Sequence, residues 1–223
     1  MMSSSSSSRG TRSHFDRQLQ AVQQDVLRMG ALVESSCWLA EQALLDRDLD
    51  AAKAVCDQDQ AVDQLYRQIE ADCLSIIALQ SPVSQDLRLL SSIMHLIRDL
   101  ERIGDHASDI GELALQLFPH PPHSSMHRIR LMLTRCRAML AMSLEALANL
   151  DAKTGQSLQA KDDWVDSDYE DLYQVLVNQP LQGSPVEQIV LLVLVIRYLE
   201  RMADHCTNIG NRVVFIVTGE RKT

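Results

Sequence analysis

One stretch of this chain occurs twice. Residues 98–112 read RDLERIGDHASDIGE, and residues 197–211, 99 positions later, read RYLERMADHCTNIGN. A second pair of segments repeats in the same order, since DQAVDQLY (59–66) and DDWVDSDY (162–169) share Asp, Val, Asp and Tyr at the same spacing. Two separate matches in one order predict that the chain is built from two copies of a single structural unit.

Each unit has the sequence pattern of three helices. Apolar residues recur at alternating spacings of three and four, the period of one helix face, and prolines in QSP, PHPPH and QGSP interrupt this pattern. Helices are expected near 19–46, 49–80, 84–118, 129–150 and 152–178, and from 185 onward. We therefore predict an all-α fold of two tandem three-helix bundles, with a disordered Ser-rich tail (1–13), a first repeat (14–118), a Pro-rich hinge (119–123) and a second repeat (124–219).

The composition fits packed helices and excludes several classes of protein. Only 4% of the 223 residues are aromatic, so the core is expected to be aliphatic. The formal net charge of −9 disfavours binding to nucleic acid or to an anionic membrane surface, because both attract clustered Lys and Arg. The longest apolar run, IVLLVLVI (189–196), is far shorter than the roughly twenty residues of a membrane-spanning helix. Five widely spaced cysteines without a C-x-x-C pair indicate a reducing compartment, and we expect a cytoplasmic protein without membrane insertion.

The repeated motif places acidic side chains on one face of a helix. With about 100° of rotation per residue, Glu101, Asp105 and Asp109 fall within a stripe of about 80°. The helix before it carries Asp59 and Asp63, four residues apart and therefore also on one face. The second unit repeats this arrangement with four carboxylates: Asp162, Asp166, Glu200 and Asp204. Neighbouring antiparallel helices can bring two such pairs together, and an oxygen-only set of ligands suits Mg²⁺, Mn²⁺, Ca²⁺ or iron.

Two other interpretations of these carboxylates stay open. A charged stripe opposite an apolar one is typical of a solvated helix surface, and the pattern alone favours metal binding and solvation about equally. A carboxylate-bridged metalloenzyme of the di-iron type would need Glu-x-x-His pairs, whereas His106 and His205 follow the glutamates by five residues. No nucleotide-binding, nucleophile or zinc-protease motif occurs in the sequence, so the chain is not expected to be an enzyme.

The segments LERIGDHASDIGE and LERMADHCTNIG, each preceded by an Asp-x-x-x-Asp helix, resemble the PhoU family of phosphate-signalling proteins. The stretch ALQSPVSQDLR (78–88) is also similar to the family's connection between its second and third helices. The resemblance implies two similar three-helix bundles and, as in some members, iron or zinc clusters held by the E(D)-x-x-x-D motifs. The implied ligands are Asp59, Asp63, Glu101, Asp105 and Asp109 in the first repeat, and Asp162, Asp166, Glu200 and Asp204 in the second. Asn208 and Asn211 replace Asp109 and Glu112 of the first repeat, so the second site is expected to be the weaker one.

The resemblance also implies a function. PhoU proteins act as negative regulators of phosphate uptake and of the phosphate-starvation response, linking the ATPase of the phosphate ABC transporter to a sensor histidine kinase. This ATPase and this kinase are therefore the expected partners, with a homodimer as a further expectation. Iron, zinc, manganese or magnesium ions are the expected cofactors. A carboxylate-bridged metalloenzyme and a metal-free helical scaffold remain the alternatives.

Overall fold

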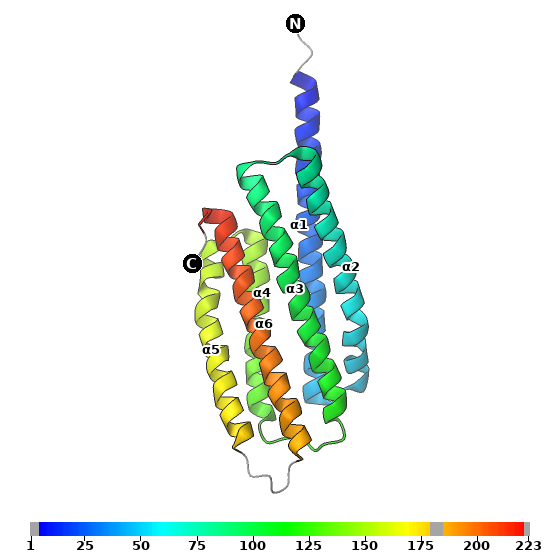
Figure 1. The fold of residues 1–223 in the computed structure, drawn as a ribbon, viewed down its shortest axis with the longest axis vertical. Coiled ribbons are helices and arrows are strands. Elements are labelled where there is room, and N and C mark those ends of the chain that lie inside the picture. Colours follow the sequence, from blue (N-terminus) through cyan, green and yellow to red (C-terminus); the bar gives the residue numbers. More distant parts are fainter. Residues whose placement is uncertain (1–4, 179–184, 221–223) are drawn as a thin grey trace.

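The chain folds into six long helices, seen in a computed structural model that describes residues 5–178 and 185–220, with side chains from His14 onward. The helices are α1 (Ser5–Glu41), α2 (Leu49–Gln80), α3 (Ser84–Leu117), α4 (Met126–Asn149), α5 (Ala152–Val177) and α6 (Val186–Thr218), with a π-helical turn, η1 (Gln42–Asp46), after α1 (Figure 1). The predicted all-α fold of two tandem three-helix bundles is confirmed: α1–α3 form the first bundle and α4–α6 the second.

Local signals in the sequence explain where these helices begin. Asp48 caps α2, because its side chain accepts hydrogen bonds from the backbone N–H groups of Asp50 and Ala51. Asp151 caps α5 in the same way, accepting from the N–H groups of Lys153 and Thr154. The two caps stand at equivalent places in the two bundles, which shows that the repeat includes the loops as well as the helices.

The N-terminal helix is longer than the sequence pattern predicts. The Ser-rich tail is expected to be disordered over residues 1–13, whereas α1 begins at Ser5. Residues 1–4 of this predicted tail lie outside the described residues. Serine is a poor helix former, but extending an existing helix adds one backbone hydrogen bond per residue without a new nucleation step.

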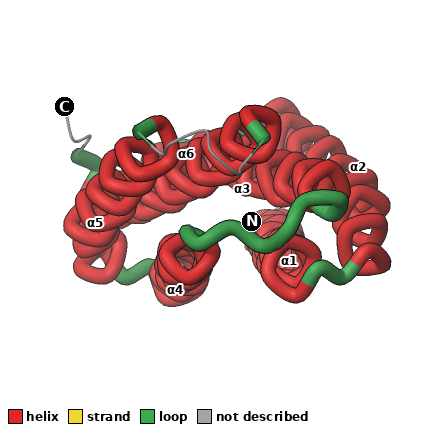
Figure 2. Tube along the Cα trace, turned by 90° about the horizontal axis from the view of Figure 1, so that it is seen from below, coloured by secondary structure: helices red, strands yellow, loops and turns green. Residues whose placement is uncertain are grey.

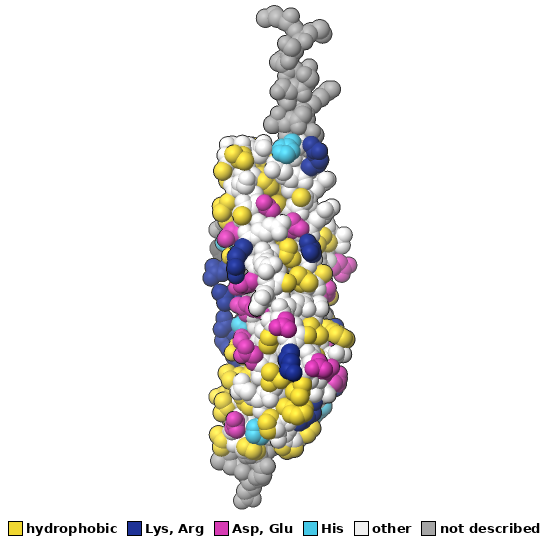
Figure 3. All heavy atoms as spheres, turned by 90° about the vertical axis from the view of Figure 1, so that its right-hand side faces the viewer, with side chains coloured by type: hydrophobic (Ala, Val, Ile, Leu, Met, Phe, Trp, Pro, Cys, Tyr) yellow, Lys and Arg dark blue, Asp and Glu magenta, His cyan; other side chains and the backbone are white. Residues whose placement is uncertain are grey.

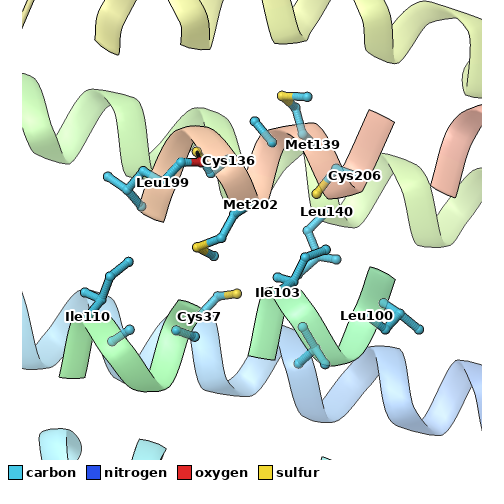
Figure 4. Close-up of a cluster of buried hydrophobic side chains, with 14 of the residues drawn as sticks. Cys37, Leu100, Ile103, Ile110, Cys136, Met139, Leu140, Leu199, Met202 and Cys206 are labelled. Atoms are coloured by element: carbon cyan, nitrogen blue, oxygen red, sulfur yellow. Dashed lines mark hydrogen bonds between the residues drawn. The ribbon is translucent and has the colours of Figure 1, made fainter. Parts of the chain in front are cut away.

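The two bundles share one hydrophobic core. Figure 2 shows α5, α6, α3 and α2 in a curved layer, with α4 and α1 together on its inner side. α3 packs against α6 and α1 packs against α4, so each bundle contributes two helices to the junction. Fully buried aliphatic side chains from α3 and α6, such as Leu100, Ile103 and Leu199, meet there (Figure 4). This continuous core fixes the position of one repeat relative to the other.

Four of the five cysteines, including Cys73, lie within this core rather than at a reactive site. Cys37, Cys136 and Cys206 are buried between the bundles (Figure 4), and all five cysteines are free. Burial raises the pKa of the Cys37 thiol to about 12, so this group stays protonated. The Cys136 thiol donates to the backbone oxygen of Leu199 at 3.2 Å. These thiols act as small apolar packing groups.

The Pro-rich segment between the bundles is held in place by both of them. Arg47 of the first bundle donates to the backbone oxygens of Phe118 and His120, the latter at 2.8 Å. Gln188 of the second bundle donates to the backbone oxygen of Pro121 at 2.6 Å. The helix break expected at PHPPH is therefore present as a fixed connection. Within the described residues, no helix combines the length and apolar character that crossing a membrane requires.

Candidate metal centre: two carboxylate clusters

The first carboxylate cluster lies between α2 and α3. Asp59 and Asp63 come from α2, and Glu101, Asp105 and Asp109 come from α3. Burial raises the pKa of Asp59, and the charges of Asp63 and Asp109 raise it further. Burial and the charge of Asp59 raise the pKa of Asp105 in the same way. The two helices thus bring the five predicted carboxylates of the first repeat into one electrostatically coupled group.

Arginines partly neutralise this first cluster. The Arg102 guanidinium lies 3.3 Å from the Glu101 carboxylate and 3.0 Å from the Asp105 carboxylate. Arg67, one turn along α2, pairs with Asp63 at 2.6 Å. The Arg102 charge lowers the pKa of Glu101 and of Asp105, but burial and the neighbouring carboxylates outweigh it. Such half-exposed ion pairs stabilise the fold only weakly.

The second cluster lies between α5 and α6 and is built from Asp162, Asp166, Glu200 and Asp204. Asp162 is only 6% exposed. Burial raises its pKa to about 6, and the charges of Asp204 and Asp166 contribute to this rise. Burial is also the main cause of the raised pKa of Glu200, opposed by the Arg197 guanidinium, which binds Glu200 at 2.7 Å.

Unpaired oxygen atoms distinguish the second cluster from the first. Asp162 Oδ1 and Glu200 Oε2 are buried and make no hydrogen bond within the described part of the chain. The Thr207 hydroxyl lies close enough to lower the pKa of Asp162 slightly, yet its Oγ1 has no hydrogen-bond partner there either. A buried carboxylate oxygen without a partner is costly, so a cation at this point would stabilise the fold.

The donors fit a hard cation, although the side chains are not arranged as a finished coordination shell. Among residues 14–178 and 185–220, no group of three or more His, Cys, Asp or Glu is placed so that it could already hold a metal ion. All nine predicted ligands are carboxylates, which suit Mg²⁺, Mn²⁺ or iron better than soft metals. Metal binding would therefore require new side-chain rotamers. The carboxylates now paired with Arg102 and Arg197 would have to turn from these arginines toward the metal ion.

The structure shows where the two substitutions behind the expected ranking of the sites lie. Asn208 and Asn211 replace acids of the first repeat, which makes the second site the weaker one by sequence. Both asparagines, however, line the groove between α3 and α6, and the side-chain amide of Asn208 points to Asp99 at 3.4 Å. The four carboxylates between α5 and α6 are unaffected, and they include the most buried of the nine predicted ligands, Asp162. The ranking by sequence stays a prediction, and the burial of Asp162 is an observation in favour of the second cluster.

The two motif histidines join the repeats, and His106 Nδ1 also lies 3.5 Å from the carboxylate of Asp109 in the first cluster. His106 is buried and its ring stacks on Tyr198 of α6, with 5.3 Å between ring centroids. Burial lowers the pKa of His106 to about 4, so it is neutral. His205 Nδ1 lies 2.9 Å from the Asp99 carboxylate of α3. Both histidines therefore face a helix of the other repeat.

A family model described as the PhoU domain matches the chain twice, over residues 26–114 and 129–213. The chain belongs to the PhoU family. The two matches fall on the two bundles, and each contains one carboxylate cluster.

Relatives and solved structures agree with this assignment. A Synechocystis protein named phosphate-specific transport system accessory protein PhoU homolog is 50% identical over 211 residues, covering 95% of this chain and 94% of its own. The crystal structure of a phosphate transport system regulatory protein PhoU from Streptococcus pneumoniae superposes with a TM-score of 0.87 at 31% identity, covering 94% of this chain and 99% of that one. The PhoU structure from Pseudomonas aeruginosa gives a TM-score of 0.88 at 32% identity, covering 92% and 100%.

The contacts that join the two PhoU repeats do not follow from the helical period. Asp99 and Tyr198 occupy equivalent positions, as do His106 and His205, because each pair is 99 residues apart. The structure pairs Asp99 with His205 and Tyr198 with His106, so one hydrogen bond and one ring stack stand at related places. The 99-residue offset in the sequence shows which residues are equivalent in the two repeats. It does not show which helices of the two repeats pack against each other.

Proposed function

We propose that this PhoU protein is an accessory regulator of phosphate-specific transport. The observation that carries the proposal is that similarity extends over both repeats and nearly the full length of relatives whose names describe that role. The expectation that the chain has no catalytic activity is part of the proposal.

In the finer form of the proposal, the protein is a negative regulator that acts as an adaptor in the cytoplasm. It contacts the ATPase of the phosphate ABC transporter and the sensor histidine kinase of the phosphate-starvation response. When phosphate is plentiful, this contact keeps the kinase from activating that response. The length of the curved layer of α2, α3, α6 and α5 supports such a role, because it offers a long surface (Figure 2).

We further propose that both carboxylate clusters bind metal ions: Asp59, Asp63, Glu101, Asp105 and Asp109 in one, and Asp162, Asp166, Glu200 and Asp204 in the other. The unpaired oxygens of Asp162 and Glu200 are the observation that supports this part. Bound cations would neutralise the two carboxylate clusters and make the surface around them attractive to anionic groups of a partner. The metal thus acts on charge and shape, with no chemical step assigned to it.

A gene deletion tests the regulatory role. In the organism that carries the gene, a phosphate-starvation reporter should be expressed constitutively in phosphate-rich medium after deletion, and the wild-type gene should restore repression. A reporter that stays repressed after deletion contradicts the proposed function.

The same strain separates regulation from metal binding. We expect Asp105→Asn combined with Asp204→Asn to restore repression only partly, because each cluster loses a central carboxylate. Full restoration by this variant would be consistent with the regulatory role but would contradict the proposal that bound metal is needed for it. Asp163→Asn, an exposed neighbour on α5, is the matched control and should complement fully.

A further inference from the structure

A polar groove separates the two carboxylate clusters. It runs between α3 and α6, has a volume of about 710 Å³, and its lining includes Arg98, Arg102, Arg201, Asn208, Asn211 and Arg212. We call it the arginine groove. Figure 3 shows Lys and Arg side chains gathered along the left edge of the α2 side, with acidic side chains next to them. Four guanidinium groups in one groove are unexpected in a chain with a net charge of −9.

Most of these guanidinium groups make no direct hydrogen bond or ion pair with another described side chain. Arg102 pairs with Glu101 and Asp105. No hydrogen bond or ion pair links the side chain of Arg98, Arg201 or Arg212 to any other residue in the described ranges 5–178 and 185–220. Burial raises the pKa of Asp109 and of Glu200 and the Arg201 charge opposes this rise, so nearby carboxylates balance part of the positive charge. An anion that bridged the guanidinium groups would balance more of it.

The acidic residue within the groove already has hydrogen-bond partners inside the protein. The Asp99 carboxylate accepts a hydrogen bond from Asn208 at 3.4 Å and lies 2.9 Å from His205 Nδ1. Asp99 is therefore already hydrogen-bonded to α6. The guanidinium groups without a direct side-chain partner remain available to bind an anion.

Comparison of the two repeats shows how the groove became positive. At the 99-residue offset, Asn208 corresponds to Asp109, Asn211 to Glu112 and Arg212 to Leu113. Each exchange makes α6 more positive by one charge, so this part of α6 exceeds its counterpart in α3 by three positive charges. In the counterpart, the charges of Asp109 and Glu112 still raise the pKa of Tyr198. The asymmetry affects the groove and leaves the four carboxylates of the second cluster intact.

We propose that the arginine groove binds a small anion that carries two or more phosphate groups. The planar guanidinium fork matches phosphate oxygens in two parallel hydrogen bonds, and Asn211 adds an amide donor. A single phosphate would engage only part of a row of separate guanidinium groups, whereas a chain of phosphates can contact several at once. The groove's volume is within the range of small-molecule sites, about 300–1,000 Å³.

Calorimetric titration of the full-length protein with tripolyphosphate, in buffer without added divalent cations, tests this proposal. We expect binding that weakens with rising salt, and much weaker binding of inorganic phosphate. Arg212→Gln should weaken tripolyphosphate binding by about tenfold or more, since it removes charge-assisted hydrogen bonds. Arg130→Gln, which removes the same charge from α4, is the control and should bind as the wild type does.

A second variant restores the acids of the first repeat without shortening any arginine. Asn208→Asp combined with Asn211→Glu should abolish binding, because it adds two negative charges to the groove. The proposal is overturned if the wild type does not bind tripolyphosphate, if inorganic phosphate binds equally well, or if neither groove variant weakens binding. The test needs neither metal nor a partner protein, so its outcome is independent of the proposed function.

Discussion

Replacing Asp162 with Asn is expected to stabilise the metal-free protein at neutral pH by about 2 kcal/mol. Asp162 is 6% exposed, and burial with the nearby charges of Asp204 and Asp166 raises its pKa from 3.8 to about 6. At neutral pH the folded protein therefore holds a charge that the unfolded chain accommodates better in water. Asn has nearly the same shape and carries no charge, so the substitution removes this cost.

The stability of the metal-free protein should depend on pH through Asp162. A carboxyl group whose pKa is higher in the folded state stabilises the fold once it is protonated. The metal-free wild type should therefore gain stability as the pH falls from above 6 to about 4, and the advantage of Asp162→Asn should disappear over the same interval. Urea unfolding at a series of pH values, after chelator treatment, measures both curves.

An exposed acid provides the control for this experiment. Asp163 is the next residue on α5 and is exposed, so Asp163→Asn should change the free energy of unfolding by no more than about 0.5 kcal/mol. If Asp162→Asn destabilised the metal-free protein at neutral pH, the claim that this carboxylate is held at a cost would be wrong.

Replacing Gly155 with Ala should cost about 2–3 kcal/mol of stability. Gly155 of α5 and Gly210 of α6 touch backbone to backbone: a Cβ at Gly155 would lie 2.7 Å from the Gly210 oxygen, and one at Gly210 would lie 2.6 Å from the Gly155 oxygen. A backbone oxygen in a helix cannot rotate away as a side chain can, so the two helices must separate. The separation outweighs the roughly 1 kcal/mol that Ala gains over Gly in a helix.

Gly104 of α3, a helix glycine with more room around it, provides the control. A Cβ there would meet Val62 Cγ1 at 3.4 Å, which is an ordinary contact. Gly104→Ala should therefore be neutral or stabilise by up to about 1 kcal/mol. Thermal and urea unfolding of both variants measure the contrast, and equal stabilities would show that the close approach of α5 and α6 does not constrain the second bundle.

Local residue patterns account for most of the fold. Asp48 and Asp151 cap α2 and α5, and Pro185 directly precedes α6, close to the helix starts that the sequence predicts. Such signals are readable from sequence because each residue affects only the backbone next to it. The start of α1 at Ser5 differs, since helix extension depends on an existing nucleus more than on the propensity of serine.

The candidate site is predictable only in part. The helical period places Glu101 beside Asp105, and the repeat places Glu200 beside Asp204. Burial of Asp162 depends instead on how closely α5 approaches α6, which in turn depends on the contact of Gly155 with Gly210. The arginine groove arises from the pairing of α3 with α6, a contact between repeats that no local pattern specifies.

Metal content is the most direct test of the claim that the duplicated carboxylates bind cations. The full-length protein would be incubated separately with iron, zinc, manganese and magnesium, desalted, and measured by elemental analysis beside Asp162→Asn combined with Asp204→Asn. We predict that at least one metal stays bound to the wild type and that the variant loses about half of it or more, because its second cluster keeps only two carboxylates. A wild type that retains no metal, or a variant that retains as much as the wild type, would contradict the account.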